Sequence, residues 1–561
     1  MPKFNIDGKE IEFKPGQTII EAAREYGIEI PHFCWHPKLS VSGNCRMCLV
    51  EVEKMPKLVI ACSTNAAEGM VVHTESDKSI SARNAVMEFF LINHPLDCPI
   101  CDEAGECKLQ DYAYQHSVGE SRFVEEKVHK DKRVELGPNV MFDGERCISC
   151  SRCIRFCDEI AKDPELTFLK RGDRVTIATF PGEQLDNPYS MNVVDICPVG
   201  ALTNRDFRFK ARVWDMAHTN TICNGCARGC NIEVWTRNNE ILRLVPRHNE
   251  DVNSYWMCDH GRLNTFKFVN AGDRVDGPHL RVEGNLIKVG WDEAFAKAAS
   301  SLRTFGKDEI AVLGSAYATV EDNFIAAKFA KSILGTGHLD FVRHLDPSFG
   351  DDILKNEDVT PNSKGAELAG VIPSKNGLDF NGIVKSIREG KIKALYILED
   401  DILNDNPELE SVLAKLDLLI INASNFNKTS ALADIVFPAA AYAEKNGTFV
   451  NFSGRVQRIR PALATLDVDR ALEGMSMSRL DKFGTKYDRW AQGKHYDARS
   501  SWKILTGLAS AMGQKLKYNM AEEVFYDLSN AVEAFKGLDY DLLGELGVQL
   551  NSVNLKSTVK I

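Results

Sequence analysis

The residues of this chain best suited to metal or redox chemistry are its sixteen cysteines, which all lie between Cys34 and Cys258. No cysteine follows Cys258 in a chain of 561 residues, whereas disulfide bonds that stabilise a secreted protein would not be confined in this way. Clustered cysteines in a reducing compartment more often bind metal. The distribution therefore predicts metal or iron-sulfur centres in the first half of the chain.

The first set of cysteines has a spacing close to that of a [2Fe-2S] ferredoxin loop. Two residues separate the central pair, and one further cysteine lies at a distance on either side. The plant-type loop has a shorter first gap, but it shares the tight central pair and the distant fourth ligand. We predict a [2Fe-2S] cluster, with structural zinc as the alternative. The predicted ligands are Cys34, Cys45, Cys48 and Cys62.

The second set combines one histidine with three cysteines. A lone histidine is more often a packed or surface residue than a metal ligand. Here the three cysteines lack a fourth partner, and His94 with Pro95 lies where the chain turns toward them after a helix expected over Ala82–Ile92. We predict a [4Fe-4S] cluster bound by His94, Cys98, Cys101 and Cys107.

The third set resembles one half of a bacterial two-cluster ferredoxin, in which the fourth cysteine of the run binds the other cluster. That fourth cysteine is Cys157, and a second cluster would need three more cysteines beside it, which the chain does not supply. We therefore predict a buried packing role for Cys157. The predicted [4Fe-4S] ligands are Cys147, Cys150, Cys153 and Cys197.

The fourth set lies among glycines that would let the backbone approach a bulky inorganic core, namely Gly225, Gly229 and Gly261. A third [4Fe-4S] cluster is predicted here, again with zinc as the alternative. Its ligands would be Cys223, Cys226, Cys230 and Cys258. Four sites need sixteen ligands, and fifteen cysteines plus His94 supply them, so no catalytic acid, base or nucleophile is predicted.

Charge and hydropathy narrow the class of protein further. A formal net charge of -11 argues against nucleic-acid binding, which needs a basic face. No stretch reaches the roughly 18 to 20 apolar residues of a membrane span, and the N-terminus enters a strand at once, without a signal or transit segment. We expect a soluble protein that is made and kept in the cytoplasm and is not inserted in a membrane.

Two kinds of fold are expected to position these sites. The hairpin Lys3–Phe13 and the helix that starts at Thr18 and ends at Gly27 are typical of a ubiquitin-like ferredoxin. After about Asp273, strands and helices alternate, which predicts an open α/β arrangement with a mainly parallel sheet. This part has neither a G-x-G-x-x-G fingerprint nor a Walker A loop, so a scaffold role is the default. The expected elements are strands at Glu309–Leu313, Ala394–Leu398 and Leu416–Asn422, and a helix capped by Thr319 that runs to Leu334.

With these motifs in place, the chain resembles the large iron-sulfur subunit of respiratory complex I, NADH:quinone oxidoreductase, in its bacterial form. The resemblance is densest at His94–Cys101 (HPLDCPIC) and Asp195–Leu202 (DICPVGAL). In the second half it rests on Ala433–Pro438, Glu444–Asn451 and Gly454–Gln457, which are similar to the molybdopterin oxidoreductase domain that this family carries without its metal.

The resemblance implies a multidomain α+β and α/β protein with one [2Fe-2S] cluster, three [4Fe-4S] clusters and no molybdopterin. The implied domains are a [2Fe-2S] ferredoxin-type domain at 1–78, a [4Fe-4S] domain with one histidine and three cysteine ligands at 79–118, a ferredoxin-like [4Fe-4S] domain at 138–212, a [4Fe-4S] domain of molybdopterin-oxidoreductase type at 216–272 and a molybdopterin-oxidoreductase-like α/β domain at 273–561.

The resemblance also implies a role in electron transfer. Electrons would come from an NADH- and FMN-binding subunit to the [2Fe-2S] site, pass to the Cys147 site and then to the His94 site, and leave to a ferredoxin-like two-cluster subunit. A small [2Fe-2S] subunit would be a further partner. The fourth cluster would lie off this path, and the complex would hold the chain on the cytoplasmic side of the inner membrane, where electron transfer to quinone is coupled to proton translocation.

Three other classes of protein share some of these features. Formate dehydrogenases can carry the same N-terminal clusters ahead of an active molybdopterin domain, but they normally place a cysteine or selenocysteine on the metal. Iron-only hydrogenases need cysteines in the C-terminal half. Neither requirement fits a chain with no cysteine beyond Cys258. A zinc-stabilised interaction protein is the non-redox alternative, and it would be colourless where an iron-sulfur protein is brown.

Overall fold

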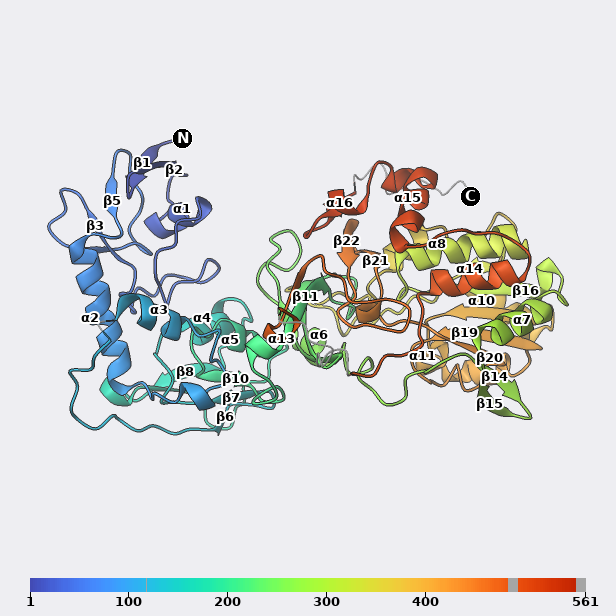
Figure 1. The fold of residues 1–561 in the computed structure, drawn as a ribbon, viewed down its shortest axis with the longest axis horizontal. Helices are drawn as coiled ribbons and strands as arrows, with labels where there is room; N and C mark the ends of the chain where they lie inside the picture. Colours follow the sequence, from blue (N-terminus) through green and yellow to red (C-terminus); the bar gives the residue numbers. More distant parts are fainter. Residues whose placement is uncertain (118, 483–492, 551–561) are drawn as a thin grey trace. The chain divides into compact units, whose positions relative to one another are not determined.

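The chain forms two compact units, Met1–Trp214 and Asp215–Ile561 (Figure 1). The computed structural model describes residues 1–117, 119–482 and 493–550, so Val118 and residues 551–561, at the ends of two predicted domains, lie outside the described part. No helix among the described residues is both long enough and apolar enough to cross a membrane.

The first unit begins with a five-stranded sheet in the order β2-β1-β5-β3-β4. Asp7 and Gly8 have positive φ angles and form the tight turn that joins the first two strands. The Glu21 carboxylate accepts a hydrogen bond from the Thr18 backbone N–H at 2.8 Å, which fixes the start of α1. The elements are β1 (Lys3–Ile6), β2 (Lys9–Glu12), α1 (Ile19–Glu25), β3 (Leu49–Val52), β4 (Val59–Ile60) and β5 (Val71–His73).

The rest of the first unit consists of short elements joined by long loops. Helix α2 (Asp77–Asn93) starts five residues earlier than the sequence suggested, because the Ser76 hydroxyl accepts a hydrogen bond from the Ser79 backbone N–H and caps it. Strands β10, β7 and β6 form one small sheet, and β8 pairs with β9. The elements are η1 (Cys98–Ile100), α3 (Lys108–His116), β6 (Val134–Glu135), β7 (Val140–Phe142), α4 (Arg152–Glu159), β8 (Leu166–Leu169), β9 (Thr176–Thr179), α5 (Asn192–Asp195) and β10 (Leu202–Asn204).

The second unit opens with antiparallel strands that carry the fourth cysteine set. The sheet has the order β13-β12-β11-β23, and Ile232, Val234 and Leu244 pack beneath it in one apolar cluster. Its strands are β11 (Ala217–Ile222), β12 (Asn231–Arg237), β13 (Glu240–Pro246) and β23 (Met475–Ser476), followed in the chain after β13 by the short helix α6 (Asp259–Leu263).

A seven-stranded sheet forms the centre of the second unit. Its order is β15-β14-β20-β19-β18-β16-β17; the five strands from β20 to β17 run parallel, and β14 and β15 add an antiparallel hairpin at one edge. The strands are β14 (His279–Val282), β15 (Asn285–Lys288), β16 (Ile310–Leu313), β17 (Leu339–Asp340), β18 (Ala394–Leu398), β19 (Leu418–Ala423) and β20 (Ile435–Pro438).

Helices cover both faces of this sheet. Along β16, Val312 belongs to the apolar cluster on one face, whereas Ala311 belongs to the cluster on the other. Buried strand faces on both sides are expected for a parallel sheet between two helical layers. One cluster draws on α7 (Trp291–Leu302), α8 (Val320–Lys328), α14 (Ser501–Ala511) and α15 (Ala521–Ala531), and the other on α10 (Phe380–Arg388), α11 (Ile402–Asp405) and α12 (Glu410–Leu413).

The strands expected from the sequence in this region are present as β16, β18 and β19. The helix capped by Thr319 is also present: α8 continues as a π-helical segment, Phe329–Leu334, and stops at Gly335, whose φ is +70°. The remaining described α-helices and β-strands of the unit are α9 (Ser363–Leu368), β21 (Gly447–Val450), β22 (Arg455–Ile459), α13 (Arg479–Lys482), α16 (Tyr540–Leu543) and β24 (Val548–Gln549).

Candidate iron-sulfur sites

The four cysteines of the first set come together beneath the N-terminal sheet. All are buried, and they lie in the loop between α1 and β3 and directly after β4. Hydrogen bonds from Cys45 and Cys62 lower the pKa of the Cys34 thiol, and Cys48 and Cys62 are hydrogen-bonded in the same way. Four buried thiols linked by hydrogen bonds in this way fit a small iron-sulfur core better than four independent packing residues.

The third set lines one small cavity in the first unit. Cys147, Cys150, Cys153 and Cys197 all contribute to its wall, together with apolar side chains such as Phe142 and Ile177. Burial raises the pKa of Cys147 to about 11, while the Ser149 backbone N–H points at its sulfur from 3.4 Å. Such N–H groups stabilise sulfur that carries negative charge. The structure therefore brings these four thiols to one place.

Cys157 lies one turn beyond Cys153 on α4 and is not among the described residues that line this cavity. Its side chain is fully buried, and burial raises the pKa of its thiol, with the carboxylates of Glu165 and Asp163 adding to the shift. A protonated, apolar thiol suits the packing role expected from the sequence.

The residues of the second set lie at the ends of α2, η1 and α3. His94 caps the C-terminus of α2, Cys98 opens η1, and Cys107 caps the N-terminus of α3. Burial lowers the pKa of His94 to about 4, so its imidazole is neutral at pH 7, the form that binds metal. Burial also raises the pKa of Cys107, to about 12, and the Cys101 thiol contributes to that shift. The role of His94 as fourth ligand stays a prediction.

The third set contacts both of the other sets of the first unit. On one side, the Asn44 side-chain amide donates to the Ser149 carbonyl at 3.0 Å, which links the first cysteine loop to the third. On the other side, a Cβ on Gly200 would lie 2.4 Å from the Cys101 sulfur. Gly200 follows Cys197 by three residues, so the segment that carries this thiol packs directly against the second set.

The fourth set lies in the second unit, in the loop between the end of β11 and the start of β12 and at the start of α6. The thiols of Cys223, Cys226, Cys230 and Cys258 are all buried. A Cβ on Gly261 would lie 3.1 Å from the Cys223 sulfur and 3.4 Å from the Cys258 sulfur, so this glycine allows the backbone to approach both. The Gly225 and Gly261 backbone N–H groups point at the same two sulfurs, from 3.4 and 3.3 Å.

Burial raises the pKa of most thiols in the second, third and fourth sets. Such thiols would become thiolates only if a nearby positive centre compensates the charge, as iron does in a cluster. Among the residues that the structure describes, no three or more His, Cys, Asp or Glu side chains are arranged to hold a single metal ion. The proposed ligands are therefore assigned to clusters of several iron atoms and not to single metal ions.

The second unit also has a cavity of about 430 Å³ at the carboxyl ends of its parallel strands, where open α/β sheets commonly bind ligands. Among the described residues that line it, none is lysine or arginine, whereas five are carboxylic acids: Asp273, Glu399, Asp400, Asp401 and Asp405. A pterin dinucleotide carries anionic phosphates, which proteins bind through cationic side chains and N–H donors. This lining does not fit such a cofactor.

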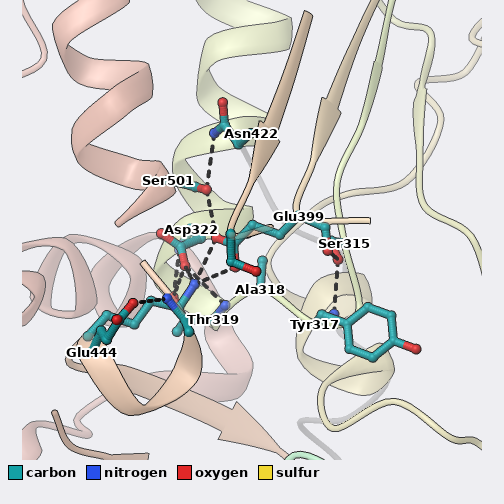
Figure 2. Close-up of polar contacts among 12 residues, drawn as sticks. Ser315, Tyr317, Ala318, Thr319, Asp322, Glu399, Asn422, Glu444 and Ser501 are labelled. Atoms are coloured by element: carbon teal, nitrogen blue, oxygen red, sulfur yellow. Dashed lines mark hydrogen bonds and ion pairs between the residues drawn. The ribbon is translucent and has the colours of Figure 1, made fainter. Parts of the chain in front are cut away.

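A buried ion cluster lies next to this cavity. The Lys445 ammonium, which is fully buried, contacts the Asp322 carboxylate at 2.9 Å and the Glu399 carboxylate at 2.6 Å. Figure 2 shows Asn422, Ser501 and Glu399 joined in one chain of hydrogen bonds, with Asp322 beside them. Burial opposes the charge on Lys445, but the two carboxylates raise its pKa. The cluster therefore links α8, the residue that follows β18 and the start of α14.

Five family models match successive parts of the chain. They are described as a 2Fe-2S iron-sulfur cluster binding domain (residues 2–77), the NADH-ubiquinone oxidoreductase-G iron-sulfur binding region (83–122), the ferredoxin-like domain of NADH-quinone oxidoreductase subunit 3 (137–203), the 4Fe-4S domain of NADH-ubiquinone oxidoreductase NDSU1/NuoG-like proteins (217–265) and molybdopterin oxidoreductase (354–466). The chain thus contains 2Fe-2S and 4Fe-4S domains and a molybdopterin oxidoreductase domain, as the sequence predicted in outline.

Curated relatives of the chain come from bacteria and from mitochondria. The NADH-quinone oxidoreductase G subunit of Rickettsia bellii is 42% identical over 59% of this chain and 48% of the relative. The G subunit of Streptomyces coelicolor is 39% identical over 60% of this chain and 40% of the relative. The mitochondrial NADH-ubiquinone oxidoreductase 78 kDa subunit of Neurospora crassa is 38% identical over 66% of this chain and 50% of the relative. The chain spans about half the length of the curated relatives it matches.

Among solved structures, a chain of an NAD+-reducing [NiFe]-hydrogenase in its H2-reduced state is 31% identical. The match covers 38% of this chain and 91% of that chain, with a TM-score of 0.34.

Proposed function

We propose that the chain belongs to the family of the large iron-sulfur subunit, or G subunit, of NADH-quinone oxidoreductase, as its relatives and family models indicate, and that it conducts electrons between partner subunits of such a complex. The bound clusters would supply one-electron redox chemistry. We propose one [2Fe-2S] cluster and three [4Fe-4S] clusters, with no molybdopterin. The proposed ligands are Cys34, Cys45, Cys48 and Cys62; His94, Cys98, Cys101 and Cys107; Cys147, Cys150, Cys153 and Cys197; and Cys223, Cys226, Cys230 and Cys258.

The observation that carries this proposal is the contiguity of three cysteine sets in the first unit. The Cys147 set contacts the loop of the Cys34 set through Asn44 and packs against the Cys101 sulfur through Gly200. Centres that share direct contacts of this kind suit stepwise electron transfer. By the family resemblance, electrons would enter at the Cys34 set, pass the Cys147 set and leave from the His94 set, while the Cys223 set would lie off this path.

The partners and the location follow from the same family membership. An NADH- and FMN-binding subunit, together with a small [2Fe-2S] subunit, would deliver electrons to the chain, and a ferredoxin-like two-cluster subunit would take them toward quinone. In the whole complex this flow is coupled to proton translocation. We propose that the chain is held on the cytoplasmic face of the inner membrane as a peripheral subunit.

The alternative, a formate dehydrogenase-type subunit, is not favoured. Such an enzyme would need a molybdenum or tungsten cofactor next to a sheet edge whose described lining carries five carboxylic acids. Metal analysis of the purified chain separates the two functions. We expect neither molybdenum nor tungsten, and either metal at about one per chain would overturn the electron-carrier proposal.

The proposed order of electron transfer is tested by removing the cluster of the Cys147 set in the assembled complex. In Cys150→Ala, NADH should still reduce the cluster of the Cys34 set, whereas the cluster of the His94 set should stay oxidised on the time scale of turnover. Rapid freeze-quench EPR measures both signals. Cys157→Ala, on the helix α4 that begins just after Cys150, is the matched control and should behave as wild type. Wild-type reduction of the His94 set in Cys150→Ala, with the central iron lost, would contradict this order.

A further inference from the structure

Two arginines of α4 join the first cysteine set to the third. The Arg152 guanidinium donates one hydrogen bond to the Trp35 carbonyl at 2.5 Å and another to the Ile196 carbonyl at 3.1 Å. Trp35 follows Cys34 in the chain, and Ile196 precedes Cys197. The Arg155 guanidinium donates to the carbonyls of Cys34 and Cys150. Each arginine therefore holds the backbone of a predicted ligand, or of its neighbour, in both sets.

Burial of the charged Arg152 side chain carries a desolvation penalty that an apolar packing residue would not have. The Arg152 side chain is buried, with an exposed fraction of 5%, and the hydrogen bonds that the described residues offer it come from carbonyl oxygens. A buried cation needs a compensating negative charge. Arg152 also lines the cavity formed by Cys147, Cys150, Cys153 and Cys197. A cluster bound there would supply the compensating negative charge.

We propose that Arg152 is the shared countercharge of the Cys34 and Cys147 centres and sets the reduction potentials of both. The inference rests on the proposed function, because it requires clusters on both sets. A fixed positive charge stabilises the reduced, more negative form of each centre. One electron then oxidises the first centre and reduces the second as it passes between them, with no bond formed or broken and no proton transferred. Arg152 would thus keep both centres within reach of the same electron donor.

Arg155 provides a natural comparison within the same helix. It bridges the same two sets, but its side chain is only half-buried, so solvent screens its charge more strongly. Its removal should shift the two potentials less than the removal of Arg152.

A purely structural role for Arg152 can be distinguished from this one. Other contacts also hold the first loop on the third: Ser40 donates its backbone N–H to the Glu159 carboxylate at 2.7 Å, and Ser151 donates its hydroxyl to that of Ser42 at 3.2 Å. These contacts do not involve Arg152 and should survive its substitution. A neutral amide at position 152 can still donate hydrogen bonds, but it carries no charge.

The experiment is an anaerobic redox titration of the full chain, with EPR signals assigned to each cluster and iron content measured in parallel. In Arg152→Gln we expect both the Cys34 and the Cys147 signals to become harder to reduce. The reduction equilibrium of each should shift by about tenfold, which is 59 mV for one electron. The clusters of the His94 and Cys223 sets should keep their potentials. Arg152→Lys should remain close to wild type, and Arg205→Gln, at an exposed ion pair with Glu135, is the matched control.

Three results would overturn the inference. These are wild-type potentials in Arg152→Gln with full iron content, a shift at only one of the two centres, or an equal or larger shift in Arg155→Gln. The proposed function fails separately, because it predicts both EPR signals in the wild-type chain. If either signal is missing there, the electron path is wrong whatever the arginines do.

Discussion

Gly200→Ala offers a steric test of the contact between the second and third cysteine sets. The added Cβ would lie 2.4 Å from the Cys101 sulfur and 2.9 Å from the Glu103 Cβ, whereas ordinary contacts begin near 3.4 Å. The difference means that the sulfur or the Cys197 segment must move by about 1 Å. Overpacking of this size typically costs about 1–3 kcal/mol of unfolding free energy. A ligand sulfur held by iron cannot rotate away, so the strain should fall on the His94 centre.

The assay combines denaturant unfolding of the first unit with iron analysis and EPR of the anaerobic protein. Gly200→Ala should be destabilised by about 1–3 kcal/mol and should lose or broaden the signal of the His94 set, while the Cys34 signal stays intact. Gly272→Ala is the control, because its Cβ would meet no atom within 4 Å. If Gly200→Ala keeps wild-type stability, iron content and EPR spectrum, the two sets are not packed together as described.

Three further predictions concern other residues. His94→Cys should preserve its cluster and lower the potential, because a thiolate adds negative charge where a neutral imidazole stood; His94→Ala should lose that cluster, and unchanged iron content and potential in His94→Ala would exclude the ligand role. Cys157→Ala should keep all four clusters at a cost of about 1 kcal/mol, measured by iron analysis and denaturation, and loss of the Cys147 signal in a folded variant would show it to be a ligand. Burial disfavours a charged His344, but its contacts with Asp400 (3.0 Å) and Asp405 (2.6 Å) raise its pKa to about 9. Its contribution to the stability of the second unit should therefore be complete below the unfolded pKa of about 6.5 and disappear as the pH rises through 9, and His344→Gln should remove this dependence.

Much of the fold followed from local signals in the sequence. The turn at Asp7 and Gly8, the caps at Thr18 and Thr319 and the stop at Gly335 act through the backbone of a few neighbouring residues, so the sequence reveals them directly. The start of α2 was placed too late, because the single capping hydroxyl of Ser76 is a weaker signal than the apolar residues that follow it. The hairpin of β14 and β15 closes through the local turn at Glu283 and Gly284, but its antiparallel pairing with β20 is a long-range contact that the local pattern does not show.

In the candidate sites, too, local spacing in the sequence was informative, whereas contacts between distant segments were not visible. Cysteine spacing pointed to four sulfur sets, and the structure gathers the cysteines of the first and third sets most clearly. The arginines of α4 gave no such signal, because nothing in their spacing indicates that they reach carbonyls more than forty residues away. Of the five carboxylic acids in the sheet-edge cavity, Glu399, Asp400, Asp401 and Asp405 follow β18 closely in the chain, whereas Asp273 joins them only in the fold.

Metal and sulfide analysis of the anaerobically purified chain, with EPR of the reduced protein, tests the central claim most directly. One [2Fe-2S] and three [4Fe-4S] clusters predict about fourteen iron atoms per chain with equal sulfide, and one binuclear and three tetranuclear signals. A reproducible value near ten would mean that one tetranuclear site is wrong, and a colourless protein that contains zinc instead of iron would contradict the electron-carrier account altogether.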